Sequence, residues 1–355
     1  MTGSDSLGVS KIGVVGAGLM ASQLALLFAR KLRVPVVISD LSEDRVRDAV
    51  VRMRSRLERD AARGRLGPAE AEQIAALISG TTDPSDFAGC TAVIEAVFEE
   101  LEVKRGVFRA VEAVVSPEAL LLTNTSSLSV AAMAEGLRHP ERVVGFHFFN
   151  PVAVLPLLEL VRTPFASEAA MAAAAGLAER LGKTAVPVAD SAGFVVNRLL
   201  TRLFDEVLEE IDDGGDPVAV DRALGPWGLP MTPLALIDYI GPAVQAHICA
   251  ALHAAFPDRF PEPASLAAVV AAGLPGFLRA DGTLRPEVRE LLPEPHDVDP
   301  EDVRERVRAA LAEEVQLMLE EGAVGSAEDL DLCMVLGANY PQGGLTPLLA
   351  ERVSA

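Results

Sequence analysis

The pattern of apolar and polar positions changes character about halfway along the chain. Residues 11–40 read as a strand, a glycine turn, a helix and a second strand, in the segments KIGVV, GAGLMA, SQLALLFAR and VPVVISD. Further apolar runs follow at TAVIEAV, ALLLTNT, RVVGFHFF, PLLELV and AVPVAD, with helical segments between them. Strands that alternate with helices predict a parallel sheet with right-handed crossovers.

From Gly193 onward the pattern is helical, beginning with FVVNRLLTRLFDEVLEEIDDGG. A weak repeat lies within it, because Asp205–Glu206 matches Glu313–Glu314 and Gly214 matches Gly322, both 108 residues apart. Two acidic amphipathic helices can also resemble each other by chance. We predict an α/β Rossmann-type domain over residues 1–190, followed by an all-α region with a duplicated helical unit. Its first domain would cover 191–295, and its second, shorter repeat 296–355.

Composition narrows the class of protein. With 355 residues, 50% hydrophobic and 23% charged, the chain has the balance of a soluble globular enzyme. Its net charge of −20 argues against nucleic acid and anionic lipid as partners. The apolar stretch 12–29 carries three glycines and no cleavage signal, so we expect neither export nor a membrane span. Cys90, Cys249 and Cys333 are widely separated, which predicts no metal site and favours a reducing cytoplasm.

The glycine turn contains the first candidate ligand-binding residues. Gly16, Gly18 and Ala21 fit the pattern G-x-G-x-x-G/A between a strand and a helix, where backbone can approach a pyrophosphate. Asp40 ends the second strand, where a carboxylate can bind the ribose hydroxyls of NAD and repel the 2′-phosphate of NADP. We expect Arg45, the nearest cation, to lie in the following helix rather than beside the strand end. The alternative is a tight turn that binds no ligand.

Polar residues also interrupt the later apolar strands. His147 lies within GFHFFNP, and Glu159 follows twelve residues later in PLLELV. Two isolated buried polar groups would each be costly, so we predict that they pair and that Glu159 orients His147 as a proton acceptor. The alternative is a histidine with an ordinary place in the core. Asn124 to Ser127 follow another strand, at the edge where open α/β sheets bind ligands.

Several longer motifs make a family resemblance specific. NTSSLS, ERVVGFHFFNPV, PLLELV and DSAGFVVNRLL, in this order and spacing, resemble the L-3-hydroxyacyl-CoA dehydrogenase family. VIEAVFEELEVK and GLPMTPLALIDYIG are most similar to the dehydrogenase portion of the multifunctional fatty-acid β-oxidation α subunit, here without the enoyl-CoA hydratase half. The resemblance implies NAD-dependent oxidation of an L-3-hydroxyacyl-CoA to the 3-oxoacyl-CoA.

The resemblance also implies roles for individual residues. His147 would be the base, Glu159 would orient it, and Ser126 and Asn197 would hydrogen-bond the substrate oxygens. The residues expected on the NAD side are Gly16, Gly18, Leu19, Met20, Asp40, Val97, Glu99, Lys104, Asn124 and Asn150. Gln23 departs from the pattern, since this branch usually has glycines after the methionine, and its bulk brings the pyrophosphate geometry into question.

An arginine-rich segment opposes the overall negative charge. Eight arginines and three acids lie between Arg45 and Arg65. Because arginine binds phosphate bidentately, we expect Arg52, Arg54 and Arg56 to bind the phosphates of coenzyme A. The alternative is a solvated helix face.

Two other functions stay open from the sequence. One is a dehydrogenase of a free hydroxy acid, or of a carrier-protein-bound 3-hydroxyacyl group, in secondary metabolism. The other is a non-catalytic NAD-binding protein. The expected partners are an acyl-CoA substrate and, as separate proteins, a hydratase or a thiolase. A homodimer and a monomer, in which the duplicated half covers the dimer surface, are both compatible with the sequence.

Overall fold

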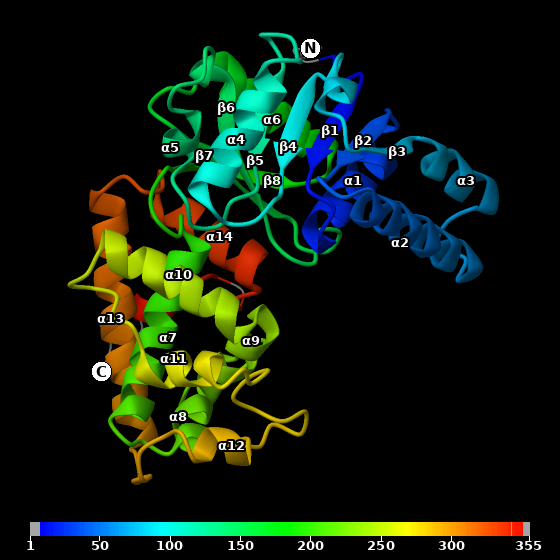
Figure 1. Ribbon diagram of the computed structural model, residues 1–355. Coiled ribbons are helices and arrows are strands. Elements are labelled where there is room, and N and C mark those ends of the chain that lie inside the picture. The colour runs from blue at the N-terminus through cyan, green and yellow to red at the C-terminus, as the bar shows by residue number, and fades with distance from the viewer. Residues whose placement is uncertain (1–7, 342, 351–355) are drawn as a thin grey trace. The chain divides into compact units, whose positions relative to one another are not determined.

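The computed structural model describes residues 8–341 and 343–350, and the chain divides into two compact units between Asp190 and Ser191 (Figure 1). The first unit is an α/β domain and the second is helical. The predicted fold class is therefore confirmed. The boundary predicted between residues 295 and 296 stays a prediction.

The first unit is built on one eight-stranded sheet in the order β3-β2-β1-β4-β5-β6-β7-β8. The strands are β1 (Ile12–Val15), β2 (Val36–Ser39), β3 (Ile78–Thr81), β4 (Ala92–Glu95), β5 (Leu120–Thr123), β6 (Val143–Phe148), β7 (Leu157–Arg162) and β8 (Thr184–Ala189). The first six strands run parallel, but β7 is antiparallel to β6 and β8 is parallel to β7. The expectation of a wholly parallel sheet is thus wrong for the last two strands, because segment 149–156 is too short for a crossover helix.

Helices cover both faces of this sheet (Figure 1). They are α1 (Leu19–Leu32), α2 (Glu43–Ala62), α3 (Pro68–Ala76), α4 (Leu101–Glu112), α5 (Val130–Ala134) and α6 (Glu168–Arg180), with short 3₁₀ turns η1 (Pro84–Phe87) and η2 (Pro140–Arg142). Apolar residues of α1, α2 and α6 form one core with the strands they cover. The amphipathic α2 buries only one stripe, which leaves most of its arginines exposed.

The second unit consists of helices. They are α7 (Val196–Asp212), α8 (Pro217–Ala223), η3 (Gly225–Trp227), α9 (Pro233–Ile240), α10 (Pro242–Ala255), α11 (Ala264–Ala271), α12 (Pro286–Arg289), α13 (Pro300–Glu320), α14 (Ala327–Ala338) and α15 (Thr346–Ala350). Within residues 8–341 and 343–350, no single helix has the length and apolarity needed to cross a bilayer. The bent pair α9 and α10, with 99° between the helices, passes that test by length and composition only.

The helices α7 and α13 pack together through reciprocal ion pairs. Arg198 Nε of α7 lies 2.5 Å from Glu314 Oε1 of α13, and Arg306 Nε of α13 lies 3.3 Å from Glu206 Oε2 of α7. Arg198 and Arg306 are 108 residues apart, as are Glu206 and Glu314. Each helix thus contributes an arginine to one ion pair and a glutamate to the other, at equivalent positions. This reciprocity is expected where two related halves pack across a local two-fold axis. The structure therefore supports the predicted duplication.

A second contact recurs in both halves. Asp221 accepts a hydrogen bond of 2.7 Å from the Leu234 amide, near the start of α9. Asp331 accepts one of 2.7 Å from the Leu345 amide, just before α15. Each aspartate thus caps a helix that begins at a Thr-Pro sequence, which satisfies amide groups that the helix itself leaves unpaired.

Candidate active site

The turn between β1 and α1 has the geometry of a dinucleotide-binding loop. Gly16 has φ of 109°, and a Cβ there would lie 2.5 Å from the Ala96 carbonyl oxygen, so only glycine fits. A Cβ at Gly18 would meet no atom within 4 Å, which leaves this backbone open to a ligand. Ala21 is fully buried, as close packing of α1 on the sheet requires. These residues fit the pyrophosphate of NAD at the N-terminus of α1.

Asp40 is held at the end of β2 by this turn. Its Oδ2 accepts a hydrogen bond of 3.1 Å from the Ala17 amide. Arg45 Nη1 lies 3.8 Å from Asp40 Oδ1, and the Arg45 guanidinium also lies 5.9 Å from the centre of the Phe98 ring. The expectation that Arg45 lies away from the strand end is therefore wrong. Arg45 does belong to the following helix, but it is in the first turn of α2 and its long side chain reaches back to Asp40.

Gln23 links α1 to the loop after β6. Its Nε2 donates to Asn150 Oδ1 at 3.1 Å, and its Oε1 accepts from the Val152 amide at 3.1 Å. The glutamine that replaces glycine at this position therefore holds the segment around Asn150 in place through these two hydrogen bonds. Leu19 is exposed at the start of α1, and Val97 lies beside the glycine turn, with its Cγ1 3.5 Å from where a Gly16 Cβ would be.

A buried cluster of charges joins the carboxyl ends of β4 and β5. Lys104 Nζ lies 2.8 Å from Glu95 Oε2 and 3.1 Å from Glu99 Oε2, and its side chain is 1% exposed. Thr123 donates a short hydrogen bond to Glu95. Glu99 and Lys104, both expected to contact NAD, therefore bind each other. Contact between this pair and NAD stays a prediction.

Glu99 in turn organises the loop that follows β5. Its Oε1 accepts hydrogen bonds from the Ser126 amide at 3.0 Å, from the Ser127 amide at 3.3 Å and from the Thr125 hydroxyl. Burial raises the pKa of Glu99, but the charge of Lys104 and these hydrogen bonds outweigh it, so the pKa lies below its usual value. The carboxylate form of Glu99 thereby holds the backbone at Ser126 in place.

His147 and Glu159 form a buried hydrogen-bonded pair. They face each other directly in the antiparallel register of β6 and β7. His147 Nδ1 lies 2.7 Å from Glu159 Oε2, and both side chains are buried. Because a carboxylate only accepts hydrogen bonds, Nδ1 donates and the neutral imidazole carries its lone pair on Nε2. The predicted pairing is present in the structure.

Asn124 also belongs to this edge of the sheet. It directly follows β5, and its Oδ1 accepts a hydrogen bond of 2.9 Å from the Phe148 amide, one residue beyond His147. Ser126 is half-buried in the loop held by Glu99. Asn197 belongs to the other unit, in the first turn of α7. The first unit thus brings Asn124, Ser126 and His147 to one edge of the sheet, whereas the role of Asn197 stays a prediction.

The three arginines expected to bind coenzyme A have different surroundings. Arg52 donates a hydrogen bond of 2.7 Å to the Ala17 carbonyl, inside the glycine turn. Arg56 lies 3.4 Å from Asp60, which also pairs with Arg30. Arg54 is exposed. The three arginines thus differ in their partners, and the binding of coenzyme A phosphates by any of them stays a prediction.

The sequence interpretation missed Glu95 and Thr123, which join the ends of β4 and β5. Glu95 could have been found, because a carboxylate at the end of the apolar run AVIE is a signal of the same kind as Glu159 in its strand. Thr123 carries no such signal, since threonine is common in strands.

Comparison with known proteins assigns the chain to a family. Residues 11–191 match the family model described as 3-hydroxyacyl-CoA dehydrogenase, NAD binding domain, and residues 193–284 match the C-terminal domain of the same family. The chain belongs to the 3-hydroxyacyl-CoA dehydrogenase family. This family consists of oxidoreductases, and the match confirms both the resemblance drawn from the sequence and NAD as the cofactor.

Individual similar proteins support the assignment to this family. A fatty acid oxidation complex subunit alpha from Idiomarina loihiensis is 36% identical over 74% of this chain and 37% of its own length. The chain spans about half, or less, of the length of the curated relatives it matches. A 3-hydroxybutyryl-CoA dehydrogenase structure from Escherichia coli has a TM-score of 0.81 and 26% identity, covering 94% of this chain and 90% of that one. FadB2 from M. tuberculosis has a TM-score of 0.71 and 36% identity, covering 75% and 94%.

Proposed function

We propose that this chain catalyses the reversible NAD-dependent oxidation of an L-3-hydroxyacyl-CoA to the 3-oxoacyl-CoA. The observation that carries the proposal is the 2.7 Å contact between His147 Nδ1 and Glu159 Oε2. A buried imidazole held in one tautomer by a carboxylate is suited to accept a proton at its other nitrogen. Membership of the family supports the proposed substrate class.

The reaction divides between proton and hydride transfer. His147 Nε2 takes the proton of the 3-hydroxyl group, and Glu159 stabilises the imidazolium that forms. NAD, when bound, supplies the acceptor for the hydride that leaves carbon 3. Gly16, Gly18 and Asp40 would hold the dinucleotide, with the two glycines at its pyrophosphate and Asp40 at its ribose. In the reverse direction, His147 returns the proton to the 3-oxo oxygen.

Substrate positioning is assigned to the polar residues around the base. Ser126 and Asn197 hydrogen-bond the oxygens of the thioester substrate, which orients carbon 3 for transfer of the hydride. The ion pair of Glu99 and Lys104 keeps the Ser126 loop fixed, since four groups of that loop donate to Glu99. The reaction takes place in the cytoplasm, and a separate hydratase and thiolase would supply its substrate and consume its product.

A comparison of three substrates tests the proposal. NADH oxidation is measured with acetoacetyl-CoA, with the truncated acetoacetyl-pantetheine and with free acetoacetate. We expect turnover of the CoA thioester, weaker use of the pantetheine thioester and negligible use of the free acid. Preference for free acetoacetate would favour the alternative of a hydroxy-acid dehydrogenase. NADH binding without turnover of any substrate in a broader panel would favour a non-catalytic protein.

A further inference from the structure

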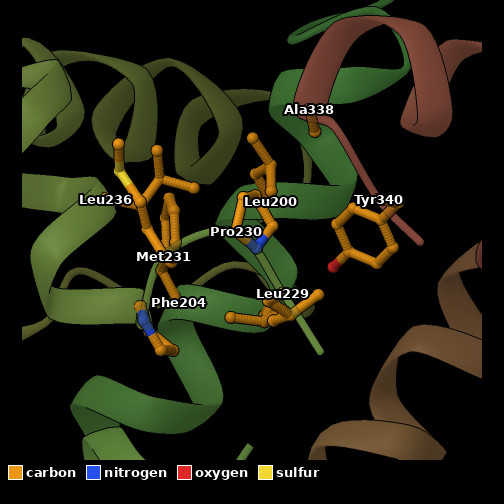
Figure 2. Close-up of a pocket in the computed structure, with 10 residues that line it drawn as sticks. Leu200, Phe204, Leu229, Pro230, Met231, Leu236, Ala338 and Tyr340 are labelled. Atoms are coloured by element: carbon orange, nitrogen blue, oxygen red, sulfur yellow. The ribbon is translucent and has the colours of Figure 1, made fainter. Parts of the chain in front are cut away.

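Two buried polar side chains of this protein differ in how far their hydrogen-bonding capacity is used. Tyr340 lines a small apolar pocket of the helical unit, and its hydroxyl has no hydrogen-bond partner among the described residues (Figure 2). Glu95, 1% exposed at the end of β4, instead accepts hydrogen bonds from three residues. A buried charge is costly unless it is paired, so the donors around Glu95 show which groups it holds in place.

Glu95 uses both of its carboxylate oxygens. Lys104 Nζ lies 2.9 Å from Oε1 and 2.8 Å from Oε2. The Thr123 hydroxyl donates to Oε1, and the Val97 amide donates to Oε2 at 3.2 Å. A glutamine cannot satisfy this site, because Lys104 donates to both oxygens and the NH₂ group would face it in either orientation. The site therefore requires a carboxylate.

A first hydrogen-bonded route leads from Glu95 through Lys104 to the loop that carries Ser126. The Lys104 ammonium bridges two carboxylates, since its Nζ also lies 3.1 Å from Glu99 Oε2. Glu99 in turn accepts the Ser126 and Ser127 amides at 3.0 and 3.3 Å. Loss of the charge on Glu95 would leave a buried ammonium with Glu99 as its countercharge, which draws this carboxylate away from the two amides.

A second route leads through Thr123, the last residue of β5. Its hydroxyl donates to Glu95, and its hydroxyl oxygen accepts the Thr125 amide at 3.1 Å. Thr125 directly precedes Ser126, and its own hydroxyl donates to Glu99. Both routes thus begin at one carboxylate and end at the segment that carries Ser126.

We propose that Glu95 is a positioning residue of the reaction, which holds Ser126 in place for the substrate through Lys104 and through Thr123. The inference rests on the proposed function, in which Ser126 hydrogen-bonds an oxygen of the thioester. Glu95 acts through these other residues, because it is buried and both of its oxygens are already bonded. Such positioning affects the rate strongly, since a displacement of 1 Å can cost ~10²-fold.

Glu95→Gln tests the proposal, and Glu112→Gln is its matched control. Glu112 is a buried carboxylate of the same unit, 7% exposed, and it accepts the amides of Arg138 and His139 at 3.0 Å each. Those two amides precede β6, at the opposite end of the sheet from Ser126. Each substitution removes one buried negative charge and keeps the shape of the side chain. An effect of lost stability alone would therefore appear in both variants.

Hydrogen exchange measures the position of the loop without any turnover. Exchange of the amides in segment 124–127 is followed by mass spectrometry in the wild type and both variants. We expect Glu95→Gln to accelerate it at least about 10-fold, because the amides lose their acceptor, and Glu112→Gln to leave it unchanged. Unchanged exchange in Glu95→Gln, or equal acceleration in the two variants, would overturn the assignment.

Thr123→Val gives a second, milder test, which does not depend on the folding of Glu95→Gln. Valine has the shape of threonine but no hydroxyl, so this variant breaks the second route and leaves Lys104 paired with Glu95. Exchange in segment 124–127 should accelerate about 3-fold, less than in Glu95→Gln. No acceleration would overturn the route through Thr123.

Kinetics test whether the position of the loop matters to the reaction. At saturating NADH, Glu95→Gln should lower kcat/KM for acetoacetyl-CoA about 10- to 100-fold, and Glu112→Gln less than about 2-fold. If Glu95 acts through Ser126, the double variant Glu95→Gln/Ser126→Ala should be no less active than Ser126→Ala. Losses that multiply in the double variant would show that Glu95 acts elsewhere.

The two measurements separate failure of this inference from failure of the proposed function. A wild-type protein that reduces no 3-oxoacyl-CoA would contradict the proposed function, whereas hydrogen exchange would still decide whether Glu95 holds the loop of Ser126. Faster exchange in Glu95→Gln with unchanged kcat/KM, in an enzyme that reduces acetoacetyl-CoA, would contradict only the positioning role.

Discussion

Arg45 Nη1 lies 3.8 Å from Asp40 Oδ1 at the end of the second strand. Asp40 is also fixed by the Ala17 amide, so a carboxylate and a cation stand together where the adenosine ribose of NAD would lie. The carboxylate favours the two ribose hydroxyls of NAD, whereas the cation could favour a 2′-phosphate. Cofactor choice therefore depends on which of the two groups dominates.

We expect Asp40 to dominate, because Arg45 is 60% exposed and screened by water, whereas Asp40 is only 15% exposed. The protein should bind NADH at least ~100-fold more tightly than NADPH, since close like charges cost several kcal/mol. Asp40→Ala should weaken NADH and strengthen NADPH, and adding Arg45→Ala should remove the gain for NADPH. Kd values for both cofactors, from NAD(P)H fluorescence, check this. Equal wild-type affinities would show that Asp40 does not select the cofactor.

The arginines of α2 should separate into two functions. Arg54→Glu should raise KM for acetoacetyl-CoA several-fold, more at low salt, and leave acetoacetyl-pantetheine nearly unchanged, because only the first substrate carries the nucleotide phosphates. Arg52→Ala should instead raise the Kd for NADH, because Arg52 is bonded to the glycine turn. If Arg54→Glu impairs both thioesters equally, the exposed face of α2 does not bind coenzyme A.

The two reciprocal ion pairs of the helical unit should differ in strength. Glu314→Gln leaves the buried Arg198 with only part of its countercharge and should cost about 3 kcal/mol of unfolding free energy. Glu206→Gln, at the equivalent position, should cost less, about 1 kcal/mol, because its partners Arg306 and Arg202 are 41% and 14% exposed, whereas Arg198 is fully buried. Urea unfolding followed by Trp227 fluorescence compares them. Equal losses would mean that burial does not decide the strength of these pairs.

Asp205 should make the helical unit sensitive to pH. Burial raises the pKa of Asp205 well above its usual value, its α7 neighbours Glu209 and Glu206 add to the shift, and Arg202 opposes it. Neither carboxyl oxygen has a hydrogen-bond partner among the described residues. A group with a raised native pKa stabilises the fold below its unfolded pKa, and this contribution is lost as pH rises through the native pKa.

Asp205→Asn removes this ionisation. The Tm of the variant minus that of the wild type should therefore increase as pH rises from about 4, and level off once Asp205 is ionised in the wild type. Thermal unfolding from pH 4 to 9 measures the difference. A difference that is constant over this range would show that folding does not raise the pKa of Asp205.

Features that depend on short sequence patterns could be predicted from the sequence. The strand–turn–helix at Gly16 follows from glycine spacing, and the pairing of His147 with Glu159 follows from the cost of two isolated polar groups in apolar strands. The contacts of Arg45 and Gln23 could not be predicted, because no pattern in the sequence shows which other element a long side chain reaches. The reversal of β7 was also missed, since an apolar run does not reveal the direction of its strand.

The central claim is that His147, oriented by Glu159, is the base of a 3-hydroxyacyl-CoA dehydrogenase. Its most direct test is the turnover of NADH with acetoacetyl-CoA in wild type, His147→Ala and Glu159→Gln, alongside the Kd of each protein for NADH. General acid–base catalysis is worth ~10² to 10⁴-fold, so turnover should fall by that order in His147→Ala and substantially in Glu159→Gln, with Kd nearly unchanged. Near-normal turnover in His147→Ala would contradict the account.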